Sequence, residues 1–543
     1  MIVNTSEKSF GDAGDASLKN GYIWGMFVRK KRNRSGTTSV SVVFKSGGTF
    51  KEVHHLGSSS DPAEIQRMYN EGCEWIALYG GQQLIDFDEK WRQEQAEAEA
   101  TTQAISNFKE ALSHVERTTL DAPQTILNRI YDRIGFNAIE DDILRHLAIA
   151  RVCQPMSKTA TVEYLKSYFD EDIQLHKIYR YMDKLHNTQR EKIQQISVAH
   201  TMDVLGGRIG LVFYDVTTLY FESAPDPSDE LRQDGFSKDG KTAESQIVLG
   251  LLVSQDGYPL SYSVFNGKQY EGYTMIPIID DFVQRFNLTD FIVVADSGLM
   301  SETNVSLLES AGYKYILGAR IRSESPKVKE WLLGIDRVDG HCDEYEKRAG
   351  QRLIVSYSES RAKKNAHNRE KGVARLQKAY AKGTLTKDKV NKRGYNKFLD
   401  ISKDITVSIN YDKIEEDARW DGLKGYITNT NLDPLEVIRQ YHGLWVVERA
   451  FRIGKSNLEM RPMFHFTPKR IEAHICICFV AYKVYKELER TIRELGIGMS
   501  VDKVLFYART IPTLRFRLPN GEAYTERLYT MPQQESIRPL IEG

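Results

Sequence analysis

The sequence predicts an α/β protein with a central mixed β-sheet, preceded by a small β module and a helical domain. Segments rich in β-branched and aromatic residues occur before residue 60, and apolar residues at helical spacing dominate from 61 to about 201. From Arg208 onward, strand-like and helix-like segments alternate. At 543 residues the chain is too long for one compact core, so several domains are expected.

The first two domains are predicted from local signals. VSVVF and TFKEVHHL, separated by Ser-Gly-Gly, indicate a β module within residues 1–60, and the sequence leaves open whether the chain starts at Met1 or Met26. Its basic run could contact phosphate or simply be solvated. Asp61-Pro62-Ala63-Glu64 is a helix-start signature that opens a helical domain at 61–205. One of its helices could read DNA, or all of them could serve packing.

The third domain is expected to be a ribonuclease H-like core, at 206–320 and 432–490. GRIGLVFYDVTTLYFE and SQIVLGLLVSQDGYPLSYSVFNG read as three antiparallel strands, the last two joined by a turn at Asp256-Gly257. TMIPIIDDFVQRF, DFIVVADSG, ETNVSLLESAG and YKYILGAR then alternate between helix and strand. Three antiparallel strands followed by this alternation is the ribonuclease H-like order of elements.

An insertion at 321–431 interrupts this core and is expected to be β-rich, with strands such as RLIVSYS and ITVSINY. Its segment from Arg361 to Lys397 holds 13 Lys and Arg against Glu370 and Asp388, a net charge of +11, although the whole chain is neutral. This local excess indicates a nucleic-acid partner. After the insertion, Asp433-Pro434-Leu435-Glu436 starts a helix expected to run past Lys455, and 491–543 form a C-terminal region.

Three acidic residues stand out as candidate metal ligands. Asp215 ends LVFYD and Asp296 ends FIVVAD, and each alone reads as a turn residue. On neighbouring strands, however, two carboxylates repel each other unless a cation lies between them. Glu448 lies seven residues from both Tyr441 and Lys455, so the three share one helix face within about 20°.

The helix face around Glu448 has two interpretations. It could be a surface stripe with a Glu448–Arg452 pair, as in an average helix. The apolar flanks of this helix predict instead that the helix is packed and that its polar face lines a site; they are Val437, Leu444, Trp445, Val447 and Phe451.

Together, YDVTT, GFSKDG, IVLGLLVSQDGYPLSYSVFNG, VVADSG and the Tyr441, Glu448, Lys455 spacing resemble the bacterial insertion-sequence transposases with a DDE site and a Tyr-Arg-Glu-Lys signature. The resemblance covers about Arg208 to Glu489 and includes WDGLKGYITNT and RIEAHICICFVAY. It implies a catalytic triad of Asp215, Asp296 and Glu448. It also implies that the insertion touches transposon-end DNA, where the expected contacts are Lys363, Lys364, Arg369 and Lys371.

One position departs from that signature, because Leu444 stands where the family has Arg. His442, Arg449 or Arg452 could take over its contact with DNA phosphate, beside Tyr441 and Lys455. The three carboxylates are expected to hold two Mg²⁺ ions, with Mn²⁺ as a substitute, because hard cations prefer carboxylate oxygens.

The predicted function is therefore a DNA transposase that binds the ends of an insertion sequence and catalyses strand cleavage and transfer, as a homodimer in the synaptic complex. A non-catalytic, DNA-binding derivative is the alternative. An aspartyl phosphatase is disfavoured because Thr217 stands where a second acid is needed. No apolar run of membrane-spanning length and no secretory signal is present, so a cytoplasmic protein with target and transposon DNA as partners, and no membrane, is expected.

Overall fold

The computed structural model describes residues 25–79, 87–222, 229–235, 244–288, 290–386, 390–391, 394–401, 407–517 and 520–543. The chain divides into two compact units, Met1–His114 and Val115–Gly543. The predicted extension before residue 25, most of the GFSKDG motif and Asp388 lie outside the described residues.

The first unit is a three-stranded antiparallel sheet covered by a helix. The sheet has the order β1 (Met26–Arg32), β2 (Thr38–Ser46) and β3 (Thr49–Ser59), and α1 (Pro62–Tyr79) packs its Met68 and Ile76 against it. A Cβ on Gly72 would lie 2.6 Å from Leu56, so glycine permits this close approach. α1 starts at the predicted proline but belongs to the β module rather than to the helical domain. The unit also includes α2 (Phe87–Ser113).

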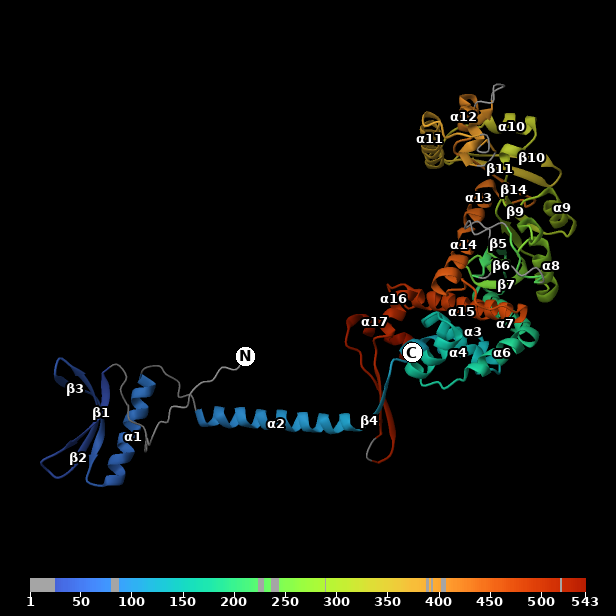
Figure 1. Ribbon diagram of the computed structural model, residues 1–543. Coiled ribbons are helices and arrows are strands. Elements are labelled where there is room, and N and C mark those ends of the chain that lie inside the picture. The colour runs from blue at the N-terminus through green and yellow to red at the C-terminus, as the bar shows by residue number, and fades with distance from the viewer. Residues whose placement is uncertain are drawn as a thin grey trace. The chain divides into compact units, whose positions relative to one another are not determined.

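The second unit contains a helical layer built around one long helix. α15 is buried along most of its 27 residues and contacts α3, α4, α6 and α7 (Figure 1). The helical segment is therefore not a separate domain, because it shares a hydrophobic core with the sheet-bearing part of the chain. The helices of this layer are α3 (Ala122–Ile134), α4 (Asp142–Cys153), α5 (Lys158–Tyr164), α6 (Leu175–Thr188), α7 (Arg190–Val204) and α15 (Pro468–Glu494).

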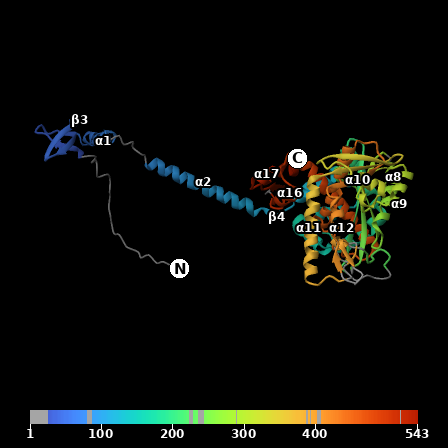
Figure 2. The same ribbon diagram turned by 90° about the horizontal axis from the view of Figure 1, so that it is seen from above.

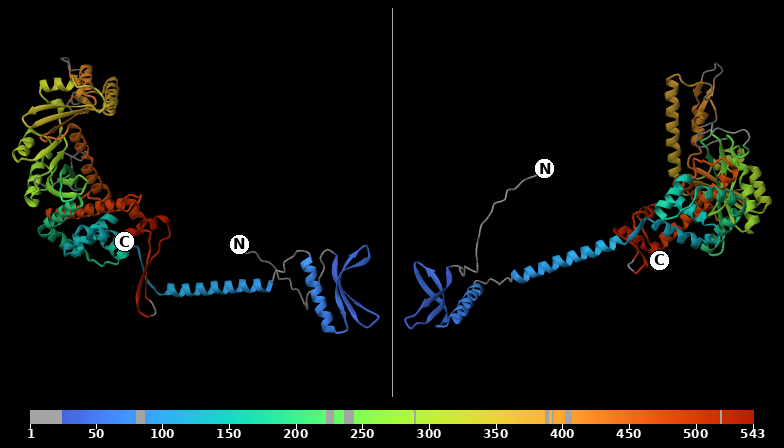
Figure 3. Two further views of the ribbon diagram at one scale, coloured as in Figure 1. Left: turned by 180° about the vertical axis from the view of Figure 1, so that it is seen from behind. Right: turned by 60° about the horizontal axis from the view of Figure 1, so that its bottom comes forward.

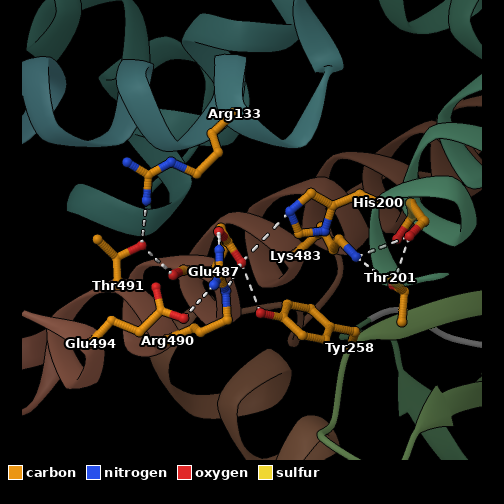
Figure 4. Close-up of polar contacts among 10 residues, drawn as sticks. Arg133, His200, Thr201, Tyr258, Lys483, Glu487, Arg490, Thr491 and Glu494 are labelled. Atoms are coloured by element: carbon orange, nitrogen blue, oxygen red, sulfur yellow. Dashed lines mark hydrogen bonds and ion pairs between the residues drawn. The ribbon is translucent and has the colours of Figure 1, made fainter. Parts of the chain in front are cut away.

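Polar groups also join α15 to its neighbours. Lys483 is fully buried, and its ammonium donates to the Ser197 carbonyl at 2.9 Å and to the Thr201 hydroxyl at 2.6 Å, both on α7 (Figure 4). One turn further, the Glu487 carboxylate accepts a 2.7 Å hydrogen bond from the Tyr258 hydroxyl and lies 3.6 Å from the His200 ring. These contacts fix the long helix against both α7 and the sheet.

The sheet of this unit has eight strands in the order β10-β11-β14-β9-β8-β5-β6-β7. β5, β8 and β9 are parallel, and β6 is antiparallel to both β5 and β7. This mixed α/β arrangement fits the predicted ribonuclease H-like core. The strands are β5 (Leu211–Tyr220), β6 (Gln246–Ser254), β7 (Pro259–Asn266), β8 (Ile292–Ala295), β9 (Lys314–Ala319), β10 (Cys342–Arg348), β11 (Gln351–Tyr357) and β14 (Leu423–Thr428).

Helices cover both faces of the sheet. α8 (Met275–Phe286) and α9 (Glu302–Ser310) lie together on one side, as Figure 2 shows, over a core that includes Val212 and Tyr214. On the opposite face, Leu211 and Phe213 pack in the core that includes α13 (Pro434–His442), α14 (Trp445–Arg452) and α15. Alternation along the strand therefore directs Asp215 to the α13–α14 face.

The insertion differs from its prediction as a β-rich domain. β10, β11 and β14 extend the main sheet, and most of the basic stretch forms the long helix α11 (gold in Figure 3). The stretch is rich in Ala, Lys and Arg, which favour helix over strand. The remaining elements are α10 (Pro326–Leu333), α11 (Glu359–Ala381), β12 (Leu399–Ile401), β13 (Val407–Ile409) and α12 (Tyr411–Ala418).

The C-terminal region returns to the beginning of this unit, because β15 pairs with both β4 and β16. In the described part of the chain, no helix is long and apolar enough to cross a membrane. This small sheet contains β4 (Val115–Thr119), β15 (Thr513–Arg517) and β16 (Ala523–Arg527). The last helices are α16 (Val501–Ala508) and α17 (Pro532–Glu542).

Candidate active site

Asp215 and Asp296 lie on adjacent parallel strands. The register of β5 and β8 pairs Tyr214 with Ala295, so the two carboxylates come next to each other, one residue further along. Asp215 is half-buried within β5, whereas Asp296 directly follows β8 and is exposed. The sheet thus places the two carboxylates on neighbouring strands, with Asp215 in the middle of β5 and Asp296 just after the end of β8. The sequence predicted a strand end at both, but β5 continues to Tyr220.

The helix that carries Glu448 is not continuous, contrary to its prediction. α13 begins at Pro434, with the Asp433 carboxylate accepting from the Leu435 N–H at 2.9 Å, but it ends at His442. α14 then begins at Trp445, and a π-helical turn at Ile453–Asn457 follows it. Gly443 lies in this break and permits close packing on the sheet, because a Cβ at this position would lie 2.5 Å from the Phe213 ring.

Tyr441 joins α13 to the second carboxylate. Its hydroxyl donates a 2.7 Å hydrogen bond to Oδ1 of Asp296, and the residue is only 3% exposed. Gly318 on β9 makes room for it, since a Cβ there would lie 2.5 Å from the hydroxyl. Burial and the charge of Asp296 raise the pKa of Tyr441, so the phenol stays protonated and keeps donating. Tyr441 therefore holds Asp296 by a hydrogen bond from the buried side of the site, and its own side chain is not exposed to solvent.

Lys424 on β14 also belongs to this site, a role that the sequence did not predict. Its ammonium lies 4.3 Å from the centre of the Tyr441 ring. Burial and the nearby Arg361 lower the pKa of Lys424, while the charges of Asp296 and Glu448 act in the opposite direction. The strand LKGYIT carries no local sign of such a role, because only the sheet order brings β14 to this face.

Glu448 lies on α14, which packs against β5 and β6. Its side chain is exposed and acts electrostatically on both Lys424 and Tyr441, so it belongs to the same neighbourhood as Asp296. Among the described residues, however, no group of three or more His, Cys, Asp or Glu side chains lies in a metal-binding arrangement. Asp296 thus lies near both Asp215 and Glu448, but the three acids do not form a compact cluster of ligands.

Several predicted DNA contacts are already engaged in ion pairs. The Arg449 guanidinium donates to both carboxylate oxygens of Glu489, which also pairs with Lys486. Arg369 donates to the two oxygens of Asp421 at 2.6 and 2.5 Å and is largely buried. The guanidinium groups of both arginines are therefore occupied by carboxylates of the chain itself.

Other predicted contacts remain accessible. Lys363 is exposed and pairs with Glu359 on the same helix, at 2.8 Å. Lys455 is half-buried on the π-helical turn. The remaining candidates are exposed: Lys364, Lys371, His442 and Arg452.

Trp445 contradicts the predicted packing of the Glu448 helix. Val437, Leu444, Val447 and Phe451 are buried as expected, but Trp445 is 56% exposed. The break at Gly443 separates α13 from α14, and the continuous helix assumed from the spacing does not exist.

Residues 206–483, just over half of the chain, match the family model of the transposase DDE domain. The chain therefore belongs to the DDE transposase family. No curated protein matches it.

Similar solved structures are also transposases, at low identity. The cryo-EM structure of a piggyBac transposase synaptic complex with hairpin DNA is 10% identical, with 72% of this chain and 77% of that chain covered and a TM-score of 0.38. The Mos1 transposase paired-end complex with left transposon end is 9% identical, covers 32% and 58%, and has a TM-score of 0.15. The Mos1 mariner paired end complex with Mn is 11% identical, covers 35% and 65%, and has a TM-score of 0.14.

Proposed function

We propose that this chain is the transposase of a bacterial insertion sequence, which binds the ends of its element and catalyses DNA cleavage and strand transfer with Asp215, Asp296 and Glu448. The observation that carries the proposal is the position of Asp215 and Asp296, each one residue beyond the paired Tyr214 and Ala295 on adjacent parallel strands, with the Tyr441 hydroxyl bonded to Asp296. Catalytic groups carried by strands and helices are held more precisely than groups on loops, and Asp215 and Glu448 lie on such elements.

The donor set suits divalent metal ions. Three carboxylates, without thiolate or imidazole ligands, fit hard cations such as Mg²⁺ or Mn²⁺. Asp215, Asp296 and Glu448 are the residues that would hold such ions. Such ions would activate the attacking oxygen and stabilise the leaving one in phosphoryl transfer. Because carboxylates repel one another, we expect the three side chains to move closer when cations bind.

The chain's own residues position the reacting parts. The Tyr441 hydroxyl holds Asp296 in one rotamer, so this ligand is orientated before DNA arrives. Lys424 and Arg361 add positive charge next to the acids, which favours a DNA phosphate at this place. They supply cationic groups where Leu444 replaces the arginine of the Tyr-Arg-Glu-Lys signature. His442 and Arg452 remain candidates for that contact, but Arg449 is bound to Glu489.

DNA outside the site would be held by the exposed lysines of α11 and by Lys455. Joining two transposon ends in one reaction requires two active sites, so a homodimer in the synaptic complex is part of this proposal. A non-catalytic, DNA-binding derivative is the competing function, and it differs in one measurable respect: its acids would be dispensable.

The test uses the full-length protein and DNA that carries the element's own ends. Replacing Asp215, Asp296 or Glu448 with Ala should abolish strand cleavage, while end binding in a mobility-shift assay stays within about threefold of wild type. Cleavage should need Mg²⁺ or Mn²⁺ and stop in excess chelator. An Asp296→Cys protein, inactive with Mg²⁺, should regain part of its activity with the softer Mn²⁺.

The competing function predicts the opposite pattern. If the three alanine variants nick end DNA at the wild-type rate, or if wild-type cleavage continues in chelator, the assignment of these acids is wrong. Bound DNA without any cleavage by the wild-type protein, in either metal, would favour the non-catalytic derivative.

A further inference from the structure

A second polar cavity, of about 400 Å³, lies in the same unit and outside the candidate active site. It is bordered by the end of α4, the start of α5, α6, the segment before α15 and α15 itself. Its main polar lining consists of Arg151, Lys158, Tyr179, Arg461, His465 and His474.

Two of these residues are cations that the fold buries without an acidic partner. Lys158 is 5% exposed and Arg151 is 6% exposed. The Arg151 guanidinium donates to the Met156 carbonyl at 3.2 Å, but no carboxylate in the described part of the chain forms an ion pair with either residue. Burial and the charge of Arg151 lower the pKa of Lys158 to about 7. Lys158 without a partner is therefore only about half protonated at pH 7, and a bound anion would favour its charged form.

Two histidines add neutral hydrogen-bond donors to the same lining. The rings of His465 and His474 lie 5.2 Å apart, and burial lowers the pKa of both, that of His465 to about 4. Each ring is therefore neutral at pH 7 and carries one N–H. Nδ1 of His474 is buried and has no hydrogen-bond partner among the described residues, whereas Nε2 lies 3.8 Å from the Cys478 sulfur. The one carboxylate in the lining, Glu459, is exposed.

From these groups we infer that the cavity binds a phosphate group, with Lys158 and Arg151 supplying charge and the imidazoles supplying hydrogen bonds. A phosphate carries negative charge for the two cations and several acceptor oxygens for the donors of this lining. The cavity is larger than one phosphate, so part of a nucleotide can enter with it.

The placement of the cavity favours a backbone phosphate of DNA as the source, and in this respect the inference rests on the proposed transposase function. The segment that borders it follows the π-helical turn of Lys455, and its Met463 N–H bonds to the carbonyl of Tyr220 at the end of β5. Phe464 lines the cavity and is 63% exposed, which offers a surface for a sugar or base. Free phosphate is the second possible source of the same group.

The experiment compares Lys158→Met with Lys166→Met, which removes an exposed lysine from the turn after α5. DNA affinity is measured by fluorescence anisotropy across a salt series, and the thermal midpoint is measured with phosphate and with chloride at equal ionic strength. The Lys158→Met protein should fold with an unchanged or higher midpoint, because a buried charge is replaced by an apolar chain. Its DNA affinity should fall at least about fivefold, and the slope of log K against log salt should flatten by about 0.9, one phosphate contact.

Three outcomes distinguish a DNA phosphate, free phosphate and no phosphate site at all. A lower DNA affinity in Lys158→Met alone assigns the site to a DNA phosphate. Unchanged DNA affinity, with a midpoint that rises about 2 °C in about 20 mM phosphate only when Lys158 is present, assigns it to free phosphate. If neither changes, or if Lys158→Met is destabilised while both binding properties survive, Lys158 is structural and the inference is wrong.

Two controls cover a Lys158→Met protein that does not fold and a failure of the proposed catalytic function. If Lys158→Met does not fold, the phosphate titration of the wild-type protein decides, and no stabilisation relative to chloride refutes the site. Binding is measured without cleavage, so an Asp215→Ala background separates this inference from the proposed function: loss of cleavage there leaves the effect of Lys158 unchanged.

Discussion

At the scale of single residues, Tyr441 and Trp445 exchange the roles expected from the sequence. Both were placed on one continuous helix, with Tyr441 facing DNA and Trp445 facing the core. In the structure Tyr441 is buried, bonded to Asp296 and packed edge-on to Tyr426, whereas Trp445 is more than half exposed. Truncating Tyr441 to Ala is therefore expected to damage folding, which the sequence did not suggest.

The Tyr441 hydroxyl can be tested separately from its ring. Tyr441→Phe keeps the packing and removes the hydrogen bond to Asp296. A hydrogen bond to a charged group contributes about 1.5 to 3 kcal/mol, so strand cleavage should slow by roughly 10- to 100-fold. Stability in urea should change by less than about 1 kcal/mol, because Asp296 is exposed and water replaces the lost donor.

Trp445→Ala is the matched comparison in the same urea experiment. Because this side chain is 56% exposed, its loss should also change stability by less than about 1 kcal/mol, far below the roughly 3 to 5 kcal/mol of a buried aromatic. A large loss of stability would show that Trp445 is packed after all. Unchanged cleavage by Tyr441→Phe would show that the hydroxyl does not position Asp296.

At the scale of elements, the basic stretch is a helix with two kinds of cation. Arg369 connects α11 to Asp417 in the last turn of α12 and to Asp421 just after it, and this connection is largely buried. Lys364 and Lys371 on the same helix are exposed. A positive segment thus divides into residues that hold the insertion together and residues that are available to DNA.

Substitutions on α11 should separate these two groups. The double variant Lys364→Gln/Lys371→Gln should flatten the slope of log K against log salt for DNA by up to about 1.8, without loss of stability. Arg369→Gln should instead lower stability by about 1 to 3 kcal/mol, because Asp421 loses its bidentate partner. Salt-dependent binding and thermal unfolding are the two measurements. An unchanged slope in the double variant would mean that these lysines are only solvated.

At the scale of the whole second unit, polar contacts on α15 connect the helical layer to the sheet. Glu487 is fully buried and is held by Tyr258 before β7, by His200 on α7 and by Arg490 on its own helix. Burial alone would raise the pKa of Glu487, but these hydrogen bonds outweigh it and hold the pKa at about 2. The network therefore depends on an ionised carboxylate.

This network predicts a specific acid sensitivity. Between about pH 4.5 and pH 2 the unfolded chain protonates Glu487 and the folded chain does not, so stability from this group is complete above pH 4.5 and is lost as pH falls toward 2. The upper bound is about 3 kcal/mol, from about 1.4 kcal/mol for each pKa unit. Thermal midpoints measured from pH 6 to pH 2.5 should fall less steeply for Glu487→Gln, from a lower starting value. Parallel pH curves for the two proteins would contradict this role.

Local patterns determined much of this protein. Alternating and buried strand segments, the turn at Asp256-Gly257, the proline-marked helix starts and Asp296 at a strand end all follow from the properties of neighbouring residues, and the structure places these elements as expected. Asp215 differs, because β5 continues past it to Tyr220. The family also follows from the sequence, because the motifs of residues 206–483 lie in order along the chain.

Only the tertiary structure decided which side chains face one another. The need for glycine at 443 depends on a phenyl ring from β5, the role of Lys424 depends on β14 joining β9, and the helical layer joins the core because α15 packs against it. The cavity around Lys158 likewise combines segments about 300 residues apart, a separation that no periodicity spans. The local sequence sets the backbone preference of each segment. Burial and ion pairing depend on contacts between segments that are distant in the sequence, so only the folded chain determines them.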